Sequence, residues 1–446
     1  MDNILARDSV RKELIAFAIP AFLSCIFTEL YNITNSFIVG NYVSLEALSA
    51  VSASTWICNI FNYTFYGLGM GAGIIVAKYY GAKDKVNLKK SLDSSIVFAV
   101  IGGIGLTLLS ESLLPLMMKL CNIGPDIYND ALRYLRVYLL GNSFVLTSQM
   151  CFFILRSFGD TKHQLYYSII SSFVNIILGV ILVRIFHLDV IGTAIATIVS
   201  QLTMDILALR LLFNYDEDIR FDFTNIDFSL DVVKEICRLG IPAGIQNMLI
   251  AISSVLVQSY VNLFPNEVIA GVGVAEKVGA WAQMSSVAVS AGTMAMVSQN
   301  MGAKDYKRAR EVIKESMFLG TMFTLVSMVI IFVLAEFIVS RFNDNELVIK
   351  YGTEALRYSL ISYFFLNWSH VYNGACRGAG NVKMPMLIAI AGQVVAKYLF
   401  VYIGLKISFD VHVLYLGTAF GYSIAGILAA IYFNTSKWTK ENHLRV

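Results

Sequence analysis

"YYGAKDKVNLKK" (Tyr79–Lys90) and "NMGAKDYKRAREVIK" (Asn300–Lys314) both contain Gly-Ala-Lys-Asp, and each tetrapeptide is followed by a run of basic residues. A chain of 446 residues offers about 10⁵ pairs of positions, so one shared tetrapeptide proves little by itself. The two glycines, Gly81 and Gly302, lie 221 residues apart. The match becomes informative only if other stretches recur with the same spacing.

Four further matches occur in the same order, at spacings of 221 to 225 residues. One nearly constant spacing along a chain is the signature of an internal repeat. We therefore interpret the chain as a tandem duplication. The matching pairs are Ile19-Pro20 with Ile241-Pro242, Ala131-Leu-Arg-Tyr134 with Ala355-Leu-Arg-Tyr358, Arg156-x-x-Gly159-x-x-Lys162 with Arg377-x-x-Gly380-x-x-Lys383, and Gly192-Thr-Ala194 with Gly417-Thr-Ala419.

The composition indicates a membrane protein. The chain is 57% hydrophobic and only 15% charged, whereas soluble domains are about 25% charged. Its apolar residues form long runs, and roughly 20 apolar residues are enough to cross a bilayer as a helix. We expect an all-α membrane protein with twelve transmembrane helices. The predicted segments are 14–39, 46–77, 92–118, 131–156, 164–186, 190–212, 236–263, 268–298, 313–339, 354–376, 384–406 and 412–433.

Basic residues are concentrated at the two termini and in alternate loops, which together hold 24 of the 34 lysines and arginines. Cytoplasmic loops of membrane proteins carry such an excess, so both termini are predicted to be cytoplasmic. Each basic run after Gly-Ala-Lys-Asp is then a topology determinant and not a ligand site. Because six helices per copy is an even number, we expect two six-helix bundles of the same orientation, related by a pseudo-two-fold axis along the membrane normal.

These expectations divide the chain into four parts. They are an N-terminal six-helix lobe (1–212), a cytoplasmic linker (213–235), a C-terminal six-helix lobe (236–434) and a cytoplasmic tail (435–446). The linker mixes acidic residues with aromatic ones such as Phe221 and Phe228, which favours a segment lying along the membrane interface over a spanning helix.

The sequence offers no sign of a catalytic or metal site. It lacks His-Glu-x-x-His, Gly-x-Ser-x-Gly and Gly-x-x-x-x-Gly-Lys. Its six cysteines include no Cys-x-x-Cys pair, so neither disulfides nor a metal centre are expected. "GLGMGAG" (Gly67–Gly73) lies within an apolar segment, where close helix packing is the favoured interpretation. We expect neither an enzyme nor a cofactor, and an intramembrane enzyme or a receptor is the least favoured class.

Ionisable residues inside the apolar segments are costly in a bilayer and therefore mark candidate functional positions. Glu29 lies midway along the first segment, and Asn32 and Ser36 share its helix face. Glu29 is a candidate for binding an ion or a proton, and the alternative is a hydrogen bond to another helix. Asp205 in the sixth segment is a second candidate, although a structural pair with Arg210 is favoured.

The second copy also contains intramembrane charges. Glu276 and Lys277 lie in the eighth segment, and Lys397 lies in the eleventh, one helical turn after Gln393. A Glu276–Lys397 pair would be less costly than two isolated charges, and such a site could bind a substrate or relay protons.

Three further polar residues of the second copy are candidates for lining a substrate cavity. Gln246 and Asn247 follow Pro242, where a helix break would expose backbone groups. His370 lies well inside the tenth segment. A hydrogen bond between helices is favoured for His370 over proton transfer.

Nearly the whole chain resembles the multidrug and toxic compound extrusion (MATE) family of the multidrug/oligosaccharidyl-lipid/polysaccharide flippase superfamily. The resemblance rests on "IPAFLSCIFTELYNITNSFIVG" (19–40), "NIILGVIL" (175–182), "IGTAIATIVSQ" (191–201), "VSQNMGAKD" (297–305) and "CRGAGNVKMPM" (376–386). It implies a V-shaped pair of six-helix lobes around a central cavity, and export of organic cations and drugs against an inward flow of Na⁺ or H⁺.

The chain departs from the family pattern at the expected coupling positions. Family members commonly carry an Asp where this chain has Asn35, and an Asn and an Asp where it has Asn175 and Gly179. An acidic residue of the seventh helix in some members has no counterpart near Ile250. The resemblance therefore leaves Glu29, within two turns of Asn35, as a replacement carboxylate.

We interpret the chain as a secondary active efflux transporter that exports drugs or other small organic molecules by antiport with Na⁺ or H⁺ through alternating access. The alternative is a flippase for a lipid-linked oligosaccharide or a related anionic lipid, which Lys277 and Lys397 would suit. We expect a monomer in the cell membrane, with a small-molecule substrate and no nucleic-acid partner.

Overall fold

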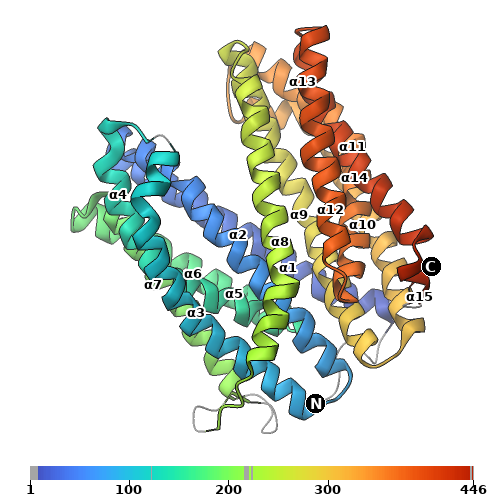
Figure 1. Ribbon diagram of the computed structural model, residues 1–446. Helices are drawn as coiled ribbons and strands as arrows, with labels where there is room; N and C mark the ends of the chain where they lie inside the picture. Colours follow the sequence, from blue (N-terminus) through green and yellow to red (C-terminus); the bar gives the residue numbers. More distant parts are fainter. Residues whose placement is uncertain (1–8, 122, 215–219, 222–224, 442–443, 445–446) are drawn as a thin grey trace. The chain divides into compact units, whose positions relative to one another are not determined.

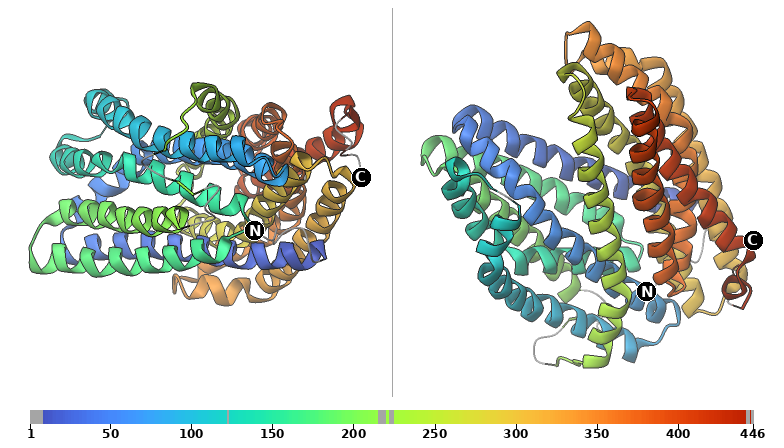
Figure 2. Two further views of the ribbon diagram at one scale, coloured as in Figure 1. Left: turned by 90° about the horizontal axis from the view of Figure 1, so that it is seen from below. Right: turned by 45° about the horizontal axis from the view of Figure 1, so that its top comes forward.

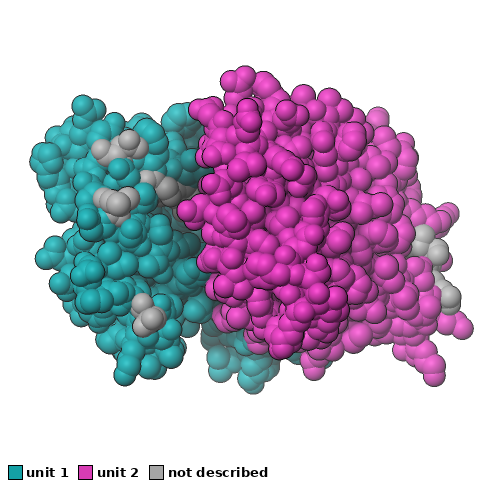
Figure 3. All heavy atoms as spheres, turned by 90° about the horizontal axis from the view of Figure 1, so that it is seen from above, with its two compact units in different colours: residues 1–3, 23–244 teal, residues 4–22, 245–446 magenta. Residues whose placement is uncertain are grey.

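The computed structural model describes residues 9–121, 123–214, 220–221, 225–441 and 444, apart from the side chains of Tyr31, Asn32, Asn35, Ser36, Asn41 and Leu45. The chain divides into two compact units, coloured separately in Figure 3. Unit 1 comprises residues 1–3 and 23–244, and unit 2 comprises residues 4–22 and 245–446. The division falls inside two helices, a few residues after Pro20 in one and Pro242 in the other.

Every element of the described chain is helical (Figure 1). The first copy of the repeat contains α1 (Val10–Tyr42), α2 (Leu45–Gly81), α3 (Lys85–Leu120), α4 (Pro125–Leu140), α5 (Asn142–Ser157), α6 (Thr161–Val180), the π-helix η2 (Ile181–Ile185) and α7 (Asp189–Phe213). The second contains α8 (Leu230–Val261), α9 (Asn266–Gly302), α10 (Tyr306–Ser340), α11 (Glu346–Gly378), α12 (Lys383–Ala389), the π-helix η3 (Ile390–Ala396), α13 (Lys397–Ile407) and α14 (Val411–Thr435), followed by α15 (Lys437–Glu441).

These elements correspond to the twelve predicted segments when α4–α5, α6–η2 and α12–η3–α13 are each taken as one segment. Among the described residues, nine helices are long and apolar enough to cross a membrane by themselves. The α4–α5 pair, bent by 48° at Gly141, makes a tenth. The remaining two, α9 and α11, carry more polar residues along their length. Within unit 2 both of them pack against α10, and α11 also packs against α14 (Figure 2).

The two Gly-Ala-Lys-Asp stretches form the same turn. In the first, α2 ends at Gly81, Lys83 has a positive φ of 55°, and the Asp84 carboxylate accepts a hydrogen bond from the backbone N–H of Asn87. The Asn87 side chain also donates to Asp84 (2.6 Å), and together these bonds hold the pKa of Asp84 below its usual range. Each tetrapeptide therefore ends one helix and caps the next.

The second Gly-Ala-Lys-Asp repeats the helix end, the positive φ and the backbone cap of the first. The helix α9 ends at Gly302, Lys304 has φ 59°, and Asp305 accepts from the N–H of Arg308 at 3.0 Å. In both copies of the repeat, the helix therefore ends at the glycine of the tetrapeptide.

The "GLGMGAG" stretch of α2 packs closely against other helices, as predicted. A Cβ atom at Gly67 would lie 2.5 Å from the Gly240 carbonyl oxygen, and one at Gly71 would lie 2.5 Å from the Ile236 carbonyl oxygen of the same helix, α8. On the other face of α2, a Cβ at Gly73 would lie 3.1 Å from Phe153 of α5. Glycine is required here because backbone atoms of the neighbouring helix occupy the space of a side chain.

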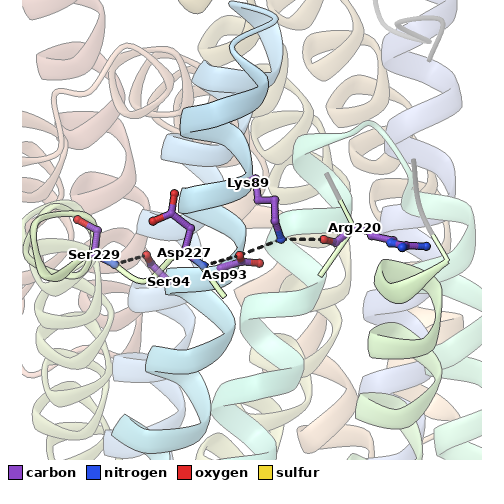
Figure 4. Close-up of polar contacts among 6 residues, drawn as sticks. All are labelled: Lys89, Asp93, Ser94, Arg220, Asp227 and Ser229. Atoms are coloured by element: carbon purple, nitrogen blue, oxygen red, sulfur yellow. Dashed lines mark hydrogen bonds and ion pairs between the residues drawn. The ribbon is translucent and has the colours of Figure 1, made fainter. Parts of the chain in front are cut away.

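The described part of the linker is fastened to α3 within unit 1 (Figure 4). The buried Asp93 carboxylate accepts from Lys89 Nζ at 3.0 Å and from the backbone N–H of Asp227 at 3.0 Å. Lys89 also donates to the Arg220 carbonyl (3.1 Å), and the backbone N–H of Ser229 donates to Ser94 Oγ (2.9 Å). The linker therefore reaches the first residue of α8 in a fixed position on α3.

Phe221 of the linker is 4% exposed and packs with a tilted ring against Phe213, with ring centroids 5.5 Å apart. It belongs to an apolar cluster formed with α2, α3, α5 and α7. Phe228, in contrast, is 44% exposed. One linker aromatic is thus part of the protein core, and the interfacial position predicted for this segment applies at most to residues such as Phe228.

Candidate functional site

The buried face of α6 in unit 1 is polar. Its buried residues are Thr161, Gln164, Ser168, Ser171, Ser172, Asn175 and Gly179, none of which is apolar in its side chain apart from glycine. Apart from Lys162 in the first turn, the residues exposed on the same helix are apolar or aromatic, among them Ile170, Phe173 and Ile177. Such a helix suits lipid outside and a polar interior, which is the opposite of a helix in a soluble core.

A chain of hydrogen bonds joins this polar face to α1 and α5. Arg156 at the end of α5 donates from Nε to Gln164 Oε1 at 2.8 Å. Gln164 Nε2 lies 3.4 Å from Ser24 Oγ, and Ser24 Oγ lies 2.7 Å from Ser168 Oγ. Ser172 Oγ donates to the Phe27 carbonyl at 3.3 Å, so residues 24–27 of α1 run along α6.

The polar face continues onto α7. Asn175 Nδ2 donates to Thr197 Oγ1 at 3.4 Å, and Ser171 Oγ donates to the Ser200 carbonyl at 2.9 Å. Asn175 is fully buried, and its Oδ1 has no hydrogen-bond partner in the described chain. An unoccupied buried acceptor is available to a ligand that carries a proton or a positive charge.

The sequence candidates on α1 are only partly placed. Glu29 is half-buried on the turn of α1 that follows residues 24–27, and its side chain leaves the helix about 140° round from that of Ser24. The side chains of Asn32, Asn35 and Ser36 lie outside the described residues.

The expected pair between Asp205 and Arg210 does not form. Asp205 is 3% exposed and neither of its carboxylate oxygens has a hydrogen-bond partner, whereas Arg210 is exposed. Five residues along an α-helix turn the side chain by about 140°, so the two groups point in different directions. The pair prediction was wrong because it counted sequence distance and not helical phase.

In unit 2, Glu276 and Lys397 act on each other electrostatically but form no ion pair in the described chain. Lys397 is 6% exposed and begins α13, directly after the π-helix η3. A Cβ at Gly421 would lie 2.8 Å from Lys397 Cβ, so this glycine makes room for the lysine stem. Glu276 and Lys277 on α9 are both exposed.

Two tyrosines extend the group around Glu276. The Tyr363 hydroxyl packs against Gly279, one turn after Glu276, and the Tyr422 ring lies beside the Tyr363 ring, with centroids 6.5 Å apart. Both tyrosines lie within the electrostatic reach of the Glu276 carboxylate. The group thus combines an acid, a buried base and two hydroxyls from α9, α11, α13 and α14.

Gln246 is buried and accepts a hydrogen bond from Arg377 at 2.7 Å, while Asn247 is half-buried. His370 is half-buried, and its carbonyl accepts from Ser290 Oγ at 2.6 Å. Gln393 lies within η3, where the carbonyl ladder is interrupted, and Ser253 Oγ donates to its carbonyl at 3.2 Å. These candidates contact different partners in unit 2, and the structure does not gather all of them at one point.

Sequence reasoning missed most of the polar face of unit 1. It selected ionisable residues and did not test the serines and amides of the fifth segment for helical phase. Residues 164, 168, 171, 172 and 175 recur with spacings of three and four, which is the signal of one helix face. Asn367 of α11 was also missed, although it is fully buried with neither polar side-chain atom partnered.

Comparison with known proteins agrees with this architecture. The MatE family model matches residues 20–181 and 242–403, one match in each copy of the repeat. The probable multidrug resistance protein YoeA of Bacillus subtilis is 24% identical over 392 residues, which cover 86% of this chain and 85% of the relative. The probable multidrug resistance protein NorM of Thermotoga maritima is 25% identical over 453 residues, covering 98% and 96%.

The fold is also that of a solved structure, described as the outward-facing conformation of a multidrug resistance MATE family transporter of the MOP superfamily. Its TM-score is 0.91 at 19% sequence identity, and the match covers 99% of this chain and 98% of that one. Because the family model matches both copies of the duplicated unit, this chain belongs to the MatE family of multi-pass membrane transporters.

Proposed function

We propose that this protein exports small organic molecules, drugs among them, from the cell by antiport with Na⁺ or H⁺ through alternating access. Relatives that cover most of the chain carry the names multidrug resistance protein and multidrug export protein, which supports this cargo class. The same names do not favour the flippase alternative.

The polar buried face of α6 carries the proposal. Buried polar side chains are costly in a membrane unless they bind each other or a ligand. Here the Asn175 oxygen is left unoccupied, and the α1 segment that contains Glu29 runs alongside. A carboxylate beside amide and hydroxyl oxygens can hold H⁺ or Na⁺ and exchange it for an organic cation.

The test is transport in proteoliposomes with an imposed gradient of either pH or Na⁺, followed with the fluorescent organic cation ethidium. We expect accumulation against the ethidium gradient under one of the two ion gradients and none after a matching ionophore collapses that gradient. Vesicles without protein are the control. Ethidium movement that is insensitive to both ion gradients would rule out antiport with these ions.

We propose that both termini are cytoplasmic, because cytoplasmic loops carry an excess of basic residues and a basic run follows each Gly-Ala-Lys-Asp turn. Lys85→Cys and Lys307→Cys should each react with a membrane-impermeant maleimide only after the cells are opened. Native Cys121 is exposed at the end of α3, on the predicted outer side, and it should react in intact cells. If Lys85→Cys and Lys307→Cys react from opposite sides, the two copies do not share one orientation.

A further inference from the structure

The buried carboxylates of unit 1 differ in their partners. Asp93 binds Lys89 and a backbone N–H. Glu111 has one buried oxygen without a partner, and the charge of Arg136 acts on it. Asp205 alone, among the described residues, has both carboxylate oxygens buried and without a partner. It is therefore the carboxylate with the least support for a negative charge.

The surroundings of Asp205 contain no compensating cation. Five elements pack against α7, namely α2, α4, α5, α6 and η2, and the cation of η2, Arg184, lies at the opposite end of α7 from Asp205 in sequence order. Of the titratable groups on them, the Cys151 thiol of α5 is the one that interacts electrostatically with Asp205. Among the described residues, no Lys, Arg or His forms a hydrogen bond or an ion pair with the carboxylate. An unpaired carboxylate in such a place would cost several kcal/mol, whereas a neutral carboxylic acid costs far less.

Asp205 is the last member of a polar ladder on α7. The ladder consists of Thr193, Thr197, Gln201 and Asp205, each four residues or about 6 Å beyond the one before. Gln201 Oε1 accepts from Ser148 Oγ at 3.0 Å. Thr197 accepts from Asn175 at 3.4 Å, so the ladder leads from Asp205 to the polar face of α6.

We propose that Asp205 is a proton-binding site, neutral in the state described here and ionised when the ladder is hydrated during the transport cycle. The reaction is the transfer of a proton from the carboxylic acid to water, in which the O–H bond breaks and its electron pair stays on the carboxylate. The return step reprotonates the carboxylate from the opposite side. This proposal rests on the proposed antiport and identifies its coupling ion as H⁺.

The first test is Asp205→Asn in proteoliposomes, with ethidium as the probe. The amide resembles the neutral acid in size but cannot release a proton. We expect accumulation driven by a pH gradient to fall at least about tenfold, because an intramembrane ionisable group that carries the coupling proton has been removed. Counterflow of labelled against unlabelled ethidium, which needs no ion gradient, should stay within about twofold of wild type.

The matched control is Glu111→Gln, the same change of acid to amide at a half-buried carboxyl of unit 1 on which the charge of Arg136 acts. It should pump like wild type. The proposal is overturned if Asp205→Asn pumps at the wild-type rate. It is also overturned if pumping and counterflow fall together, because Asp205 would then serve the structure or the substrate and not the coupling.

A second measurement does not depend on the variant folding. Infrared spectra of wild-type protein at neutral pH, with and without aspartate-specific ¹³C labelling, should contain a carboxylic-acid C=O band that shifts with the label. Absence of such a band would overturn the proposal. Wild-type export driven by Na⁺ alone would refute Asp205 as the coupling site and leave the proposed antiport intact, whereas no gradient-driven export at all would refute the antiport itself.

Discussion

Gly67→Val is expected to prevent stable folding of unit 1. The first side-chain atom at this position would lie 2.5 Å from the Gly240 carbonyl oxygen and 2.7 Å from the Gly244 backbone nitrogen. These are backbone atoms of α8 and cannot move aside as a side chain can. Overpacking typically costs about 1–3 kcal/mol, and forcing two helix backbones apart lies at the upper end of that range. We expect a lower melting temperature and little monodisperse protein by fluorescence-detected size exclusion.

Gly105→Val is the matched control, because a Cβ at Gly105 on α3 meets no atom within 4 Å. It makes the same exchange in a helix of the same unit. Equal losses in the two variants would mean that the effect comes from valine in a membrane helix and not from the contact between α2 and α8.

Glu29→Gln is expected to reduce gradient-driven export at least about tenfold while leaving expression and membrane insertion unchanged. Antiport needs a group whose charge is satisfied by the ion and by the cargo in turn. Glu29 is half-buried on the turn of α1 that follows the residues lying along α6, and we expect it to be the group that meets both. Glutamine keeps an acceptor oxygen and adds donors, but it has no charge to exchange. Ethidium accumulation in proteoliposomes is the measurement.

Glu46→Gln, an exposed carboxylate at the start of α2, is the control for this change and should export normally. If Glu29 only hydrogen-bonds a neighbouring helix, glutamine would replace it well. Normal export by Glu29→Gln would leave this residue without a coupling role and direct attention to Asp205 and to Glu276 in unit 2.

The parts of the fold that local chemistry determines could be predicted from the sequence. Each helix end at Gly-Ala-Lys-Asp follows from a glycine, a residue with positive φ and a capping aspartate, all within one tetrapeptide. The close packing of Gly67 and Gly71 follows from small residues one turn apart in an apolar helix. In both cases the information lies within a few residues of the feature.

The candidate site could be predicted only in part, because its contacts join distant segments. Nothing in the sequence near Asp205 says that the facing position of α5 is Cys151 and not a lysine. In the same way, Lys397 is buried beneath Gly421 while Glu276 is exposed, so the predicted ion pair is replaced by a longer-range interaction. Charge pairing depends on burial and side-chain direction, and a helix pattern gives these only approximately.

The two copies of the repeat can also be compared with each other as though they were two homologous proteins. Lys83 and Lys304 both occupy the left-handed region of φ, where a residue with a side chain costs about 1–2 kcal/mol and glycine costs far less. The copies have diverged at most positions, yet each keeps lysine where glycine or asparagine would relieve backbone strain. Both copies thus keep a positive charge at the apex of a strained turn. We infer that the charge of this loop matters more to the protein than relief of the backbone strain would.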